Sequence, residues 1–257
     1  WAYDLDGNLR AAPHFGGINN QKPNSFDFSN YGLVPINIDT WGQWIFINLN
    51  GNAGNLKEHV KPLENRLKGI NLNDLRLVGV LDFGEINTNW KFLMENFIEP
   101  YHVPVVHKST TDQPLGDHYV VSDGKCLGSA VDISSDKDDD ELGDSLNVSS
   151  RYLTLFPNFV LGRYFPDQLG VYVNLPVSSS RTHQYRAIYK TDGVDAGGQE
   201  TETLMKLWWD VHKEDHEMCE RLQQGRSSAI SSEGGILSPH WETSVREFQD
   251  LVMSAIR

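Results

Sequence analysis

The order of apolar and polar positions in the first 83 residues predicts short strands and turns interrupted by one helix. The Asp6-Gly7 pair predicts a tight hairpin near the start. Residues 34–49 are rich in β-branched and aromatic side chains, which predicts two short strands around a break at residues 40–42. Apolar residues recur at helical spacing over residues 56–67, and residues 75–83 predict a further strand.

The middle of the chain alternates one helix with a series of strands. Residues 89–98 predict a helix, whereas Pro100 and Pro104 argue against a regular helix over residues 100–107. Residues 115–133 predict irregular chain with short strand candidates. Strand-like runs then occupy residues 152–156, 158–163, 170–175 and 183–190. Because their links are too short for helical crossovers, these runs predict an antiparallel meander.

Two helices complete the pattern. The first is a long helix over residues 201–224, with Gly225 as its stop. The second runs from Ser238-Pro239 to Ile256, with Ser238 as its N-cap. The order of strands, helix, strands and long helix indicates an α+β fold.

Composition narrows the class of protein. The 257 residues, 39% of them hydrophobic, suffice for one large domain or a domain with a smaller piece. The net charge of −13 makes nucleic acid and anionic membranes poor partners. Acidic residues between Asp136 and Asp144 predict a solvated loop, because they lack the spacing of a calcium loop.

The ends and the cysteines bear on location. Cys126 and Cys219 give no disulfide framework, which favours a reducing cytoplasm. No apolar run reaches membrane-spanning length, and no signal peptide is evident. The chain opens at Trp1 without a methionine, which suggests a fragment.

His102 and His107 are the first candidate metal ligands. On an ideal helix their spacing would set the side chains about 140° apart, since each residue turns by about 100°. The intervening Pro104 opposes such a helix and lets the chain bend both imidazoles toward one point. Neutral imidazole suits Fe(II), Zn(II) and similar ions.

Asp215 is the third candidate, because it continues the apolar stripe of the long helix. That stripe comprises Leu204, Leu207, Trp208, Val211, Met218, Cys219 and Leu222. A carboxylate facing the core is costly unless it is paired or bound to a metal. The paired alternative is an ion pair with Arg151, Arg163 or Arg186. The nearby acids Glu214, Glu217 and Glu220 lie mainly off the stripe, and we expect them to be solvated.

Two histidines and one carboxylate form the facial triad of non-heme Fe(II) oxygenases, which leaves coordination positions open for O2. A rival pair is His212 and His216, but their surroundings do not match H-E-x-x-H or its inverse, so a zinc hydrolase is disfavoured. The other histidines are expected in surface or core hydrogen-bonding roles: His14, His59, His118, His183 and His240.

A family resemblance supports the triad. Residues 89–107 resemble the iron-binding signature of Rieske oxygenase α subunits, N-W-K-x-x-x-E-N-[FY]-x-[ED]-x-Y-H-x-x-x-x-H, at every specified position. Residues 214–225 resemble the later E-D-x-x-x-C-E-x-x-Q-x-G stretch of the same family. Residues 155–158 and 237–239 also fit, so the resemblance covers nearly the whole chain.

The resemblance implies roles for five residues. His102, His107 and Asp215 would be the ligands of one mononuclear Fe(II). Glu99 stands where the family places the acid that links an iron-ligating histidine to the cluster-ligating histidine of a neighbouring subunit. Such a carboxylate would also hold the imidazole tautomer. Asn96 would lie beside the iron.

The resemblance also implies a domain organisation. Residues 1–52 would be the β-rich tail of a Rieske domain whose [2Fe–2S] ligands lie upstream, since neither cluster motif is present. Residues 53–257 would be the mononuclear iron domain, with a helix-grip (START/Bet v1-like) fold in which an antiparallel sheet wraps a long C-terminal helix. Relatives form homotrimers and receive electrons from NAD(P)H through a ferredoxin or flavin reductase.

The expected reaction is O2-dependent hydroxylation or dihydroxylation of a small aromatic-ring compound, as in aromatic hydrocarbon catabolism. One alternative is a monooxygenase or N-demethylase of a quaternary amine of the choline, glycine betaine or carnitine type. An aromatic cage for such a cation has four candidate residues, which core packing also explains: Tyr164, Tyr172, Trp208 and Trp209. The other alternative is a metal-free helix-grip module that binds an apolar ligand.

Overall fold

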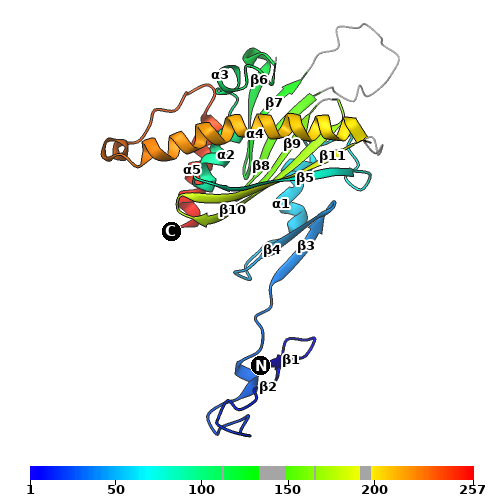
Figure 1. The fold of residues 1–257 in the computed structure, drawn as a ribbon, viewed down its shortest axis with the longest axis vertical. Helices are drawn as coiled ribbons and strands as arrows, with labels where there is room; N and C mark the ends of the chain where they lie inside the picture. Colours follow the sequence, from blue (N-terminus) through cyan, green and yellow to red (C-terminus); the bar gives the residue numbers. More distant parts are fainter. Residues whose placement is uncertain (112, 133–148, 165, 192–197) are drawn as a thin grey trace. The chain divides into compact units, whose positions relative to one another are not determined.

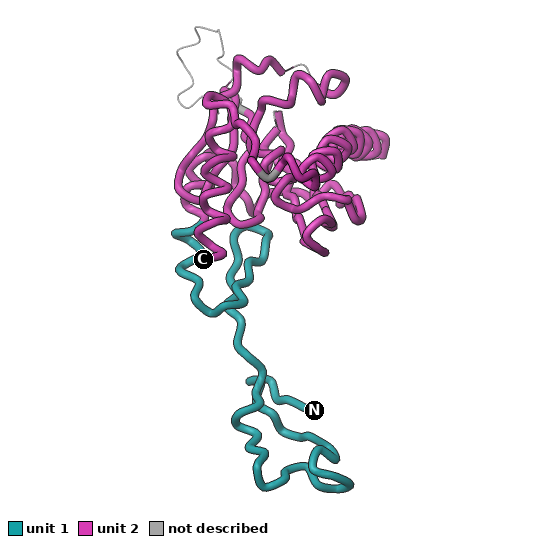
Figure 2. The backbone as a smooth tube through the Cα atoms, turned by 90° about the vertical axis from the view of Figure 1, so that its left-hand side faces the viewer, with its two compact units in different colours: residues 1–59 teal, residues 60–257 magenta. Residues whose placement is uncertain are grey.

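The computed structural model describes residues 1–111, 113–132, 149–164, 166–191 and 198–257. The chain divides into two compact units, residues 1–59 and residues 60–257, which Figure 2 colours separately. The acidic stretch between Asp136 and Asp144 lies outside the described residues.

The first unit contains two hairpins, as the sequence predicts. In the first, β1 (Ala2–Tyr3) pairs with β2 (Leu9–Ala11), and Gly7 takes the positive φ of 83° that the turn requires. In the second, β3 (Asn37–Trp41) pairs with β4 (Trp44–Asn48) in antiparallel register. A short 3-10 helix, η1 (Phe28–Asn30), lies between the two hairpins in the sequence.

Helix α1 (Leu56–Glu64) follows at the division between the units. It ends three residues before the predicted position 67, and its apolar positions Val60 and Leu63 are buried. Leu67 is also buried although it lies after the end of α1. The spacing of apolar residues therefore predicts the burial of Leu67, but not the end of the helix.

The second unit is organised around one seven-stranded antiparallel sheet with the order β5-β11-β10-β9-β8-β7-β6 (Figure 1). Its strands are β5 (Arg76–Ile86), β6 (His118–Asp123), β7 (Cys126–Asp132), β8 (Ser149–Leu155), β9 (Phe159–Tyr164), β10 (Gln168–Ser178) and β11 (Arg181–Lys190). The predicted antiparallel meander is therefore confirmed.

The short strand candidates over residues 115–133 are confirmed, but this part of the chain is more regular than expected. A short 3-10 helix, η2 (Leu115–Asp117), leads into the hairpin of β6 and β7, which turns at Gly124 with a φ of 61°. Six consecutive residues of β7 are buried, so the strand lacks the polar–apolar alternation by which a half-exposed strand is identified.

The helices are α2 (Trp90–Ile98), α3 (Val103–Val106), α4 (Gly198–Arg226), the 3-10 helix η3 (Ala229–Glu233) and α5 (Thr243–Ala255). Two predicted boundaries are wrong. Helix α4 continues through Gly225, where the backbone makes no left-handed turn and an added Cβ would meet nothing within 4 Å. Helix α5 begins at Thr243, because the Ser238 hydroxyl caps a separate turn by accepting from Trp241 N at 3.2 Å.

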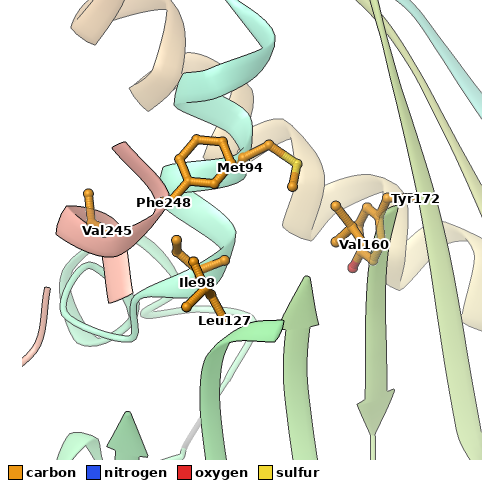
Figure 3. Packing of buried hydrophobic residues seen from close by; sticks show 7 residues of the cluster. All are labelled: Met94, Ile98, Leu127, Val160, Tyr172, Val245 and Phe248. Carbon is orange, nitrogen blue, oxygen red and sulfur yellow. The ribbon is translucent and has the colours of Figure 1, made fainter. Parts of the chain in front are cut away.

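The main core lies where α2 and α5 meet the sheet (Figure 3). It contains Met94 and Ile98 from α2, Leu127, Val160 and Tyr172 from the sheet, and Val245 and Phe248 from α5. This packing fixes α2, so the segment that leaves its C-terminal end starts from a rigid support.

One face of the sheet is covered by α4, which runs across the strands in Figure 1. Directly paired residues point to the same side of a sheet. Tyr152 pairs with Gly162, and Gly162 with Gly170; two residues further along β10, Tyr172 pairs with Arg186. The buried residues of α4 that face inward are Leu204, Trp208, His212 and Cys219. An aromatic-rich layer thus lies between sheet and helix.

Among the described helices, none has the combination of length and apolar character that a bilayer crossing requires.

Candidate metal centre

The two candidate histidines lie at opposite ends of one helical turn. The prediction that no regular helix spans residues 100–107 is confirmed, because only residues 103–106 are helical and form the single turn α3. Pro104 sits in its first turn, where a missing N–H breaks no helical hydrogen bond. His102 precedes the turn and His107 ends it, with His107 N donating to Val103 O at 2.9 Å.

Asp215 reaches this turn from α4. Its Oδ1 lies 3.0 Å from His107 Nε2 and 3.6 Å from His102 Nε2. The candidate ligand atoms of the three residues all lie within 4.8 Å of one another. Adjacent ligands on bonds of about 2.1 Å stand roughly 3 Å apart around an octahedral ion. Small side-chain shifts therefore suffice for these residues to share one ion.

The alternative of an ion pair between Asp215 and an arginine is wrong for the described residues. Arg151 pairs with Asp132 at 2.7 Å, and Arg186 lies against His212. The ionic neighbours of Asp215 are His102 and His107. Asn96, at the exit of α2, donates from Nδ2 to Asp215 Oδ1 at 2.9 Å and thereby places a helix side chain beside the candidate centre.

In both histidines, the nitrogen Nδ1, which points away from Asp215, contacts a carboxylate. His102 Nδ1 lies 2.6 Å from Glu99 Oε1, and the other Glu99 oxygen accepts from the backbone N–H groups of Tyr101 and, at 3.2 Å, of His102. His107 Nδ1 lies 2.8 Å from Glu214 Oε2. In the neutral imidazole, a carboxylate at Nδ1 favours the tautomer with its lone pair on Nε2, the nitrogen nearer to Asp215, so that this nitrogen could bind a metal ion.

The expectation that Glu214 and Glu220 are solvated is therefore wrong. Glu214 also accepts from the hydroxyls of Ser109 and Thr110, at 2.9 and 2.8 Å. Glu220 Oε1 accepts from Asn87 N at 2.9 Å. Both acids lie beside the apolar stripe, but segments distant in sequence meet α4 at its edges. Glu217 is exposed, as expected, and pairs with Arg221.

The charges at the centre reinforce one another. Burial lowers the pKa of His107, but the hydrogen bonds and negative charges of Asp215 and Glu214 outweigh it and raise that pKa to about 9. Burial raises the pKa of Asp215, but the hydrogen bond and charge of His107 and the charge of His102 hold it well below its usual range. Both shifts show that the centre stabilises positive charge. With no ion bound, this charge is the proton on His107, and a divalent cation would replace that proton.

A cavity of about 150 Å³ adjoins the three residues. Besides His102, His107 and Asp215, its walls include five large aromatic side chains: Phe97, Tyr152, Tyr164, Tyr172 and Trp208. A small organic molecule in this space would lie next to the candidate metal ligands.

The expected aromatic cage differs from the structure in two ways. Trp209 does not line the cavity but stacks on Phe83, with ring centroids 5.1 Å apart. The other three rings already contact a cation of the protein. The Arg186 guanidinium carbon lies 3.5 Å from the ring centre of Trp208, 4.7 Å from Tyr172 and 5.1 Å from Tyr164. No sequence signal pointed to Arg186 in this position.

The remaining histidines on α4 do not form a second centre among the described residues. His212 Nε2 accepts from Arg186 Nη1 at 3.0 Å, whereas His216 Nε2 lies 2.7 Å from Gln184 Oε1. The zinc-hydrolase pairing therefore has no support. His118 also departs from expectation: it is buried on the cavity wall, but neither ring nitrogen has a hydrogen-bond partner among the described residues.

A family profile and individual relatives both place the chain among oxygenases. The sequence profile described as "Ring hydroxylating alpha subunit (catalytic domain)" matches residues 66–257. The chain is 26% identical to the chloroplastic choline monooxygenase of Beta vulgaris, over 93% of its own length and 53% of that protein. It is also 26% identical to the carnitine monooxygenase oxygenase subunit of Acinetobacter baumannii, over 98% and 69% of the respective lengths. The chain thus spans about half to two thirds of these relatives.

Solved structures give the same fold. A structure of the quaternary ammonium Rieske monooxygenase CntA with an inhibitor matches with a TM-score of 0.76 and 21% identity, covering 100% of this chain and 70% of CntA. Naphthalene 1,2-dioxygenase from Rhodococcus sp., bound to indole, matches with a TM-score of 0.66 and 14% identity, over 99% and 73% of the two chains. The large antiparallel sheet and its long helix are therefore those of Rieske oxygenase catalytic domains.

Proposed function

Since this chain belongs to the family of ring-hydroxylating α subunits, we propose that it is the oxygen-activating part of a Rieske-type non-heme iron oxygenase. His102, His107 and Asp215 would hold one Fe(II). The observation that carries the proposal is their convergence from two segments far apart in the sequence, with each imidazole held from behind by a carboxylate. A metal-free ligand-binding module would need neither feature.

Each residue around the centre has a role in this proposal. Glu99 and Glu214 orient the imidazoles and keep Nε2 unprotonated toward the ion. Asn96 holds the Asp215 carboxylate in place through its N–H. The bound iron would supply O2 activation, because three protein ligands leave coordination positions open. The aromatic walls exclude bulk water from the adjoining cavity and place the substrate against the open side.

The rest of the machinery is also part of the proposal. Residues 1–52 would be the end of a Rieske domain with its [2Fe–2S] ligands upstream, and residues 53–257 a helix-grip catalytic domain. Electrons from NAD(P)H would arrive through a ferredoxin or flavin reductase. In a homotrimer, Glu99 would stand on the path from a neighbouring subunit's cluster to His102. The inter-subunit electron transfer named for a CntA structure supports this arrangement.

A quaternary amine of the choline or carnitine type is the substrate class that the relatives support. The curated relatives are choline and carnitine monooxygenases, and CntA has been solved with γ-butyrobetaine and with L-carnitine. The cavity beside the triad has the size for such a molecule and several aromatic walls. The reaction would be monooxygenation of a C–H bond of the amine, or its oxidative N-demethylation.

One observation favours a second candidate, an uncharged substrate such as an aromatic ring. Arg186 is fully buried, and its guanidinium faces the three rings that would otherwise receive a substrate cation. The positive charge of Arg186, which lies against these rings, opposes the binding of a positively charged substrate in the cavity. Naphthalene 1,2-dioxygenase, which acts on an uncharged ring, has the same fold.

Metal analysis tests the proposed centre. The chain is incubated anaerobically with Fe(II) or Co(II), freed of excess ion, and its metal content is measured. About one ion per chain is expected for the wild type, and none for Asp215→Ala. Asp210→Ala is the matched control, because Asp210 lies on the same helix but pairs with Lys206 at the surface. Full metal retention by Asp215→Ala would show that the assignment is wrong.

An isosteric pair of ligands decides between the two substrate classes. Choline and 3,3-dimethyl-1-butanol share their shape but differ in charge. Titration of each into the Co(II)-loaded chain is followed by calorimetry and by the cobalt absorption bands. Tighter binding of choline supports the quaternary amine; tighter binding of the neutral alcohol supports the second candidate.

A further inference from the structure

His118 is a buried histidine on the cavity wall that has no hydrogen-bond partner among the described residues. It lies at the start of β6, its side chain is 6% exposed, and neither Nδ1 nor Nε2 is bonded within the described part of the chain. The other two buried histidines are both satisfied: His107 by Glu214 and Asp215, and His212 by Arg186.

An unpartnered buried imidazole costs free energy, because its hydrogen bonds to water are lost on folding and nothing replaces them. Burial also lowers the pKa of His118, so the ring is neutral near pH 7 and offers one N–H donor and one acceptor. Such a group in a folded protein requires an explanation, and one explanation is a ligand, an ion or a water molecule that binds to it.

The surroundings identify that partner as a ligand of the cavity. The His118 ring stacks on Tyr152, with centroids 5.7 Å apart and planes at 30°. The Tyr152 hydroxyl already donates to Gln113 Oε1 at 2.7 Å, and the hydroxyls of Tyr164 and Tyr172 bond to each other at 2.7 Å. Among these four rings, His118 is therefore the one whose polar atoms all lack a hydrogen-bond partner within the described part of the chain.

We propose that His118 is the polar anchor of the substrate, donating its N–H to a hydroxyl or carboxylate oxygen and so orienting the molecule beside the metal ligands. The inference deepens the proposed function and rests on it. It identifies the substrate as a compound that carries an oxygen function close to the carbon that is oxidised, rather than a bare hydrocarbon or a simple tetraalkylammonium ion.

Ligand pairs that differ only in this oxygen test the proposal. Choline and glycine betaine carry a hydroxyl and a carboxylate, whereas ethyltrimethylammonium carries neither. Two further probes have a carbon atom in place of the quaternary nitrogen: 3,3-dimethyl-1-butanol is the uncharged analogue of choline, and 3,3-dimethylbutanoate is the anionic analogue of glycine betaine. Each probe is titrated by calorimetry into the Co(II)-loaded chain, whose cobalt bands confirm the loading before any probe is added.

We expect the wild type to bind at least one oxygen-bearing probe on the order of tenfold more tightly than ethyltrimethylammonium. His118→Leu should lose this preference, and His118→Gln should keep part of it, because its amide retains a donor and an acceptor. Which probe is preferred distinguishes hydroxyl from carboxylate recognition. His183→Leu is the matched control, since His183 pairs with Asp82 on another strand pair and does not line the cavity.

Chemical denaturation of the same variants supplies a second readout. Because leucine leaves no buried nitrogen unpaired, His118→Leu should unfold at a denaturant midpoint no lower than that of the wild type. An unchanged oxygen preference in His118→Leu, or a loaded wild type that prefers no oxygen-bearing probe, would overturn the proposal. Absence of the cobalt bands, in contrast, is a failure of the proposed metal centre and appears before the probes are used.

Discussion

Glu214 Oε2 lies 2.8 Å from Nδ1 of His107, so the residue immediately before Asp215 holds the far side of the imidazole that Asp215 contacts. Two consecutive residues of α4 thus act on one histidine from opposite directions. Glu99 does the same for His102 from the end of α2. The candidate centre is therefore a set of two imidazoles whose orientation is fixed before any ion binds.

The first prediction concerns this support. Glu214→Gln removes the negative charge at His107 Nδ1 but leaves an amide of the same size. We expect metal affinity to fall about 10- to 100-fold, the usual cost of losing such a partner. Competition with a chelator measures the affinity. Glu217→Gln is the control, because Glu217 is exposed on the same helix; equal affinities of the two variants would contradict the role of Glu214.

The second prediction concerns the cation behind the aromatic wall. Arg186→Gln removes the charge but keeps an N–H donor for His212. Affinity for choline, relative to 3,3-dimethyl-1-butanol, should rise on the order of tenfold, because the variant no longer places a positive charge behind the aromatic wall of the cavity. Calorimetry on the metal-loaded chain measures the ratio. Arg181→Gln, which loses only a surface pair with Glu85, should leave the ratio unchanged.

The third prediction concerns pH. Burial and the positive charge of Arg186 hold the pKa of His212 well below 6.5 in the folded chain. As the pH falls below 6.5, His212 gains a proton in the unfolded chain but stays neutral in the folded chain. The free energy of unfolding therefore decreases. The loss reaches about 1.4 kcal/mol per pH unit for one such group.

His212→Gln keeps an acceptor for Arg186 but cannot titrate. The difference in the free energy of unfolding between pH 7.5 and pH 5.5, measured by chemical denaturation, should therefore be smaller in the variant than in the wild type. Identical pH dependence in the two chains would show that His212 titrates normally when folded.

The fourth prediction uses two glycines as opposite cases. A Cβ on Gly170 would lie 2.7 Å from Arg186 Nη2, and the guanidinium is held against Trp208, so it has little room to retreat. Gly170→Ala should cost about 1–3 kcal/mol of stability. A Cβ on Gly225, in the last turn of α4, meets nothing within 4 Å. Gly225→Ala should add up to about 1 kcal/mol. Thermal unfolding of both variants measures these opposite effects.

The sequence by itself determined the elements and the candidate ligands. Strand and helix periodicities are local properties, so the meander, α2 and α4 follow from side-chain spacing alone. Asp215 could be placed toward the core because a helix has a fixed phase, and its polar side chain interrupts an otherwise apolar stripe. The proline between His102 and His107 indicated a bend in the chain, but it did not predict that residues 103–106 form one helical turn.

The tertiary structure alone decided which side chains satisfy one another. Glu214 and Glu220 lie off the buried stripe, and only the arrival of distant segments at the edges of α4 gives them partners. Arg186 faces three aromatic rings because the register of β10 and β11 aligns it with Tyr172. Gly170 leaves space for its guanidinium, and Gly162 leaves space for the Tyr164 ring. His118 has no hydrogen-bond partner in the described part of the chain for the same kind of reason. Hydrogen bonds and ring contacts depend on three-dimensional distances, which the spacing along one strand or helix does not contain.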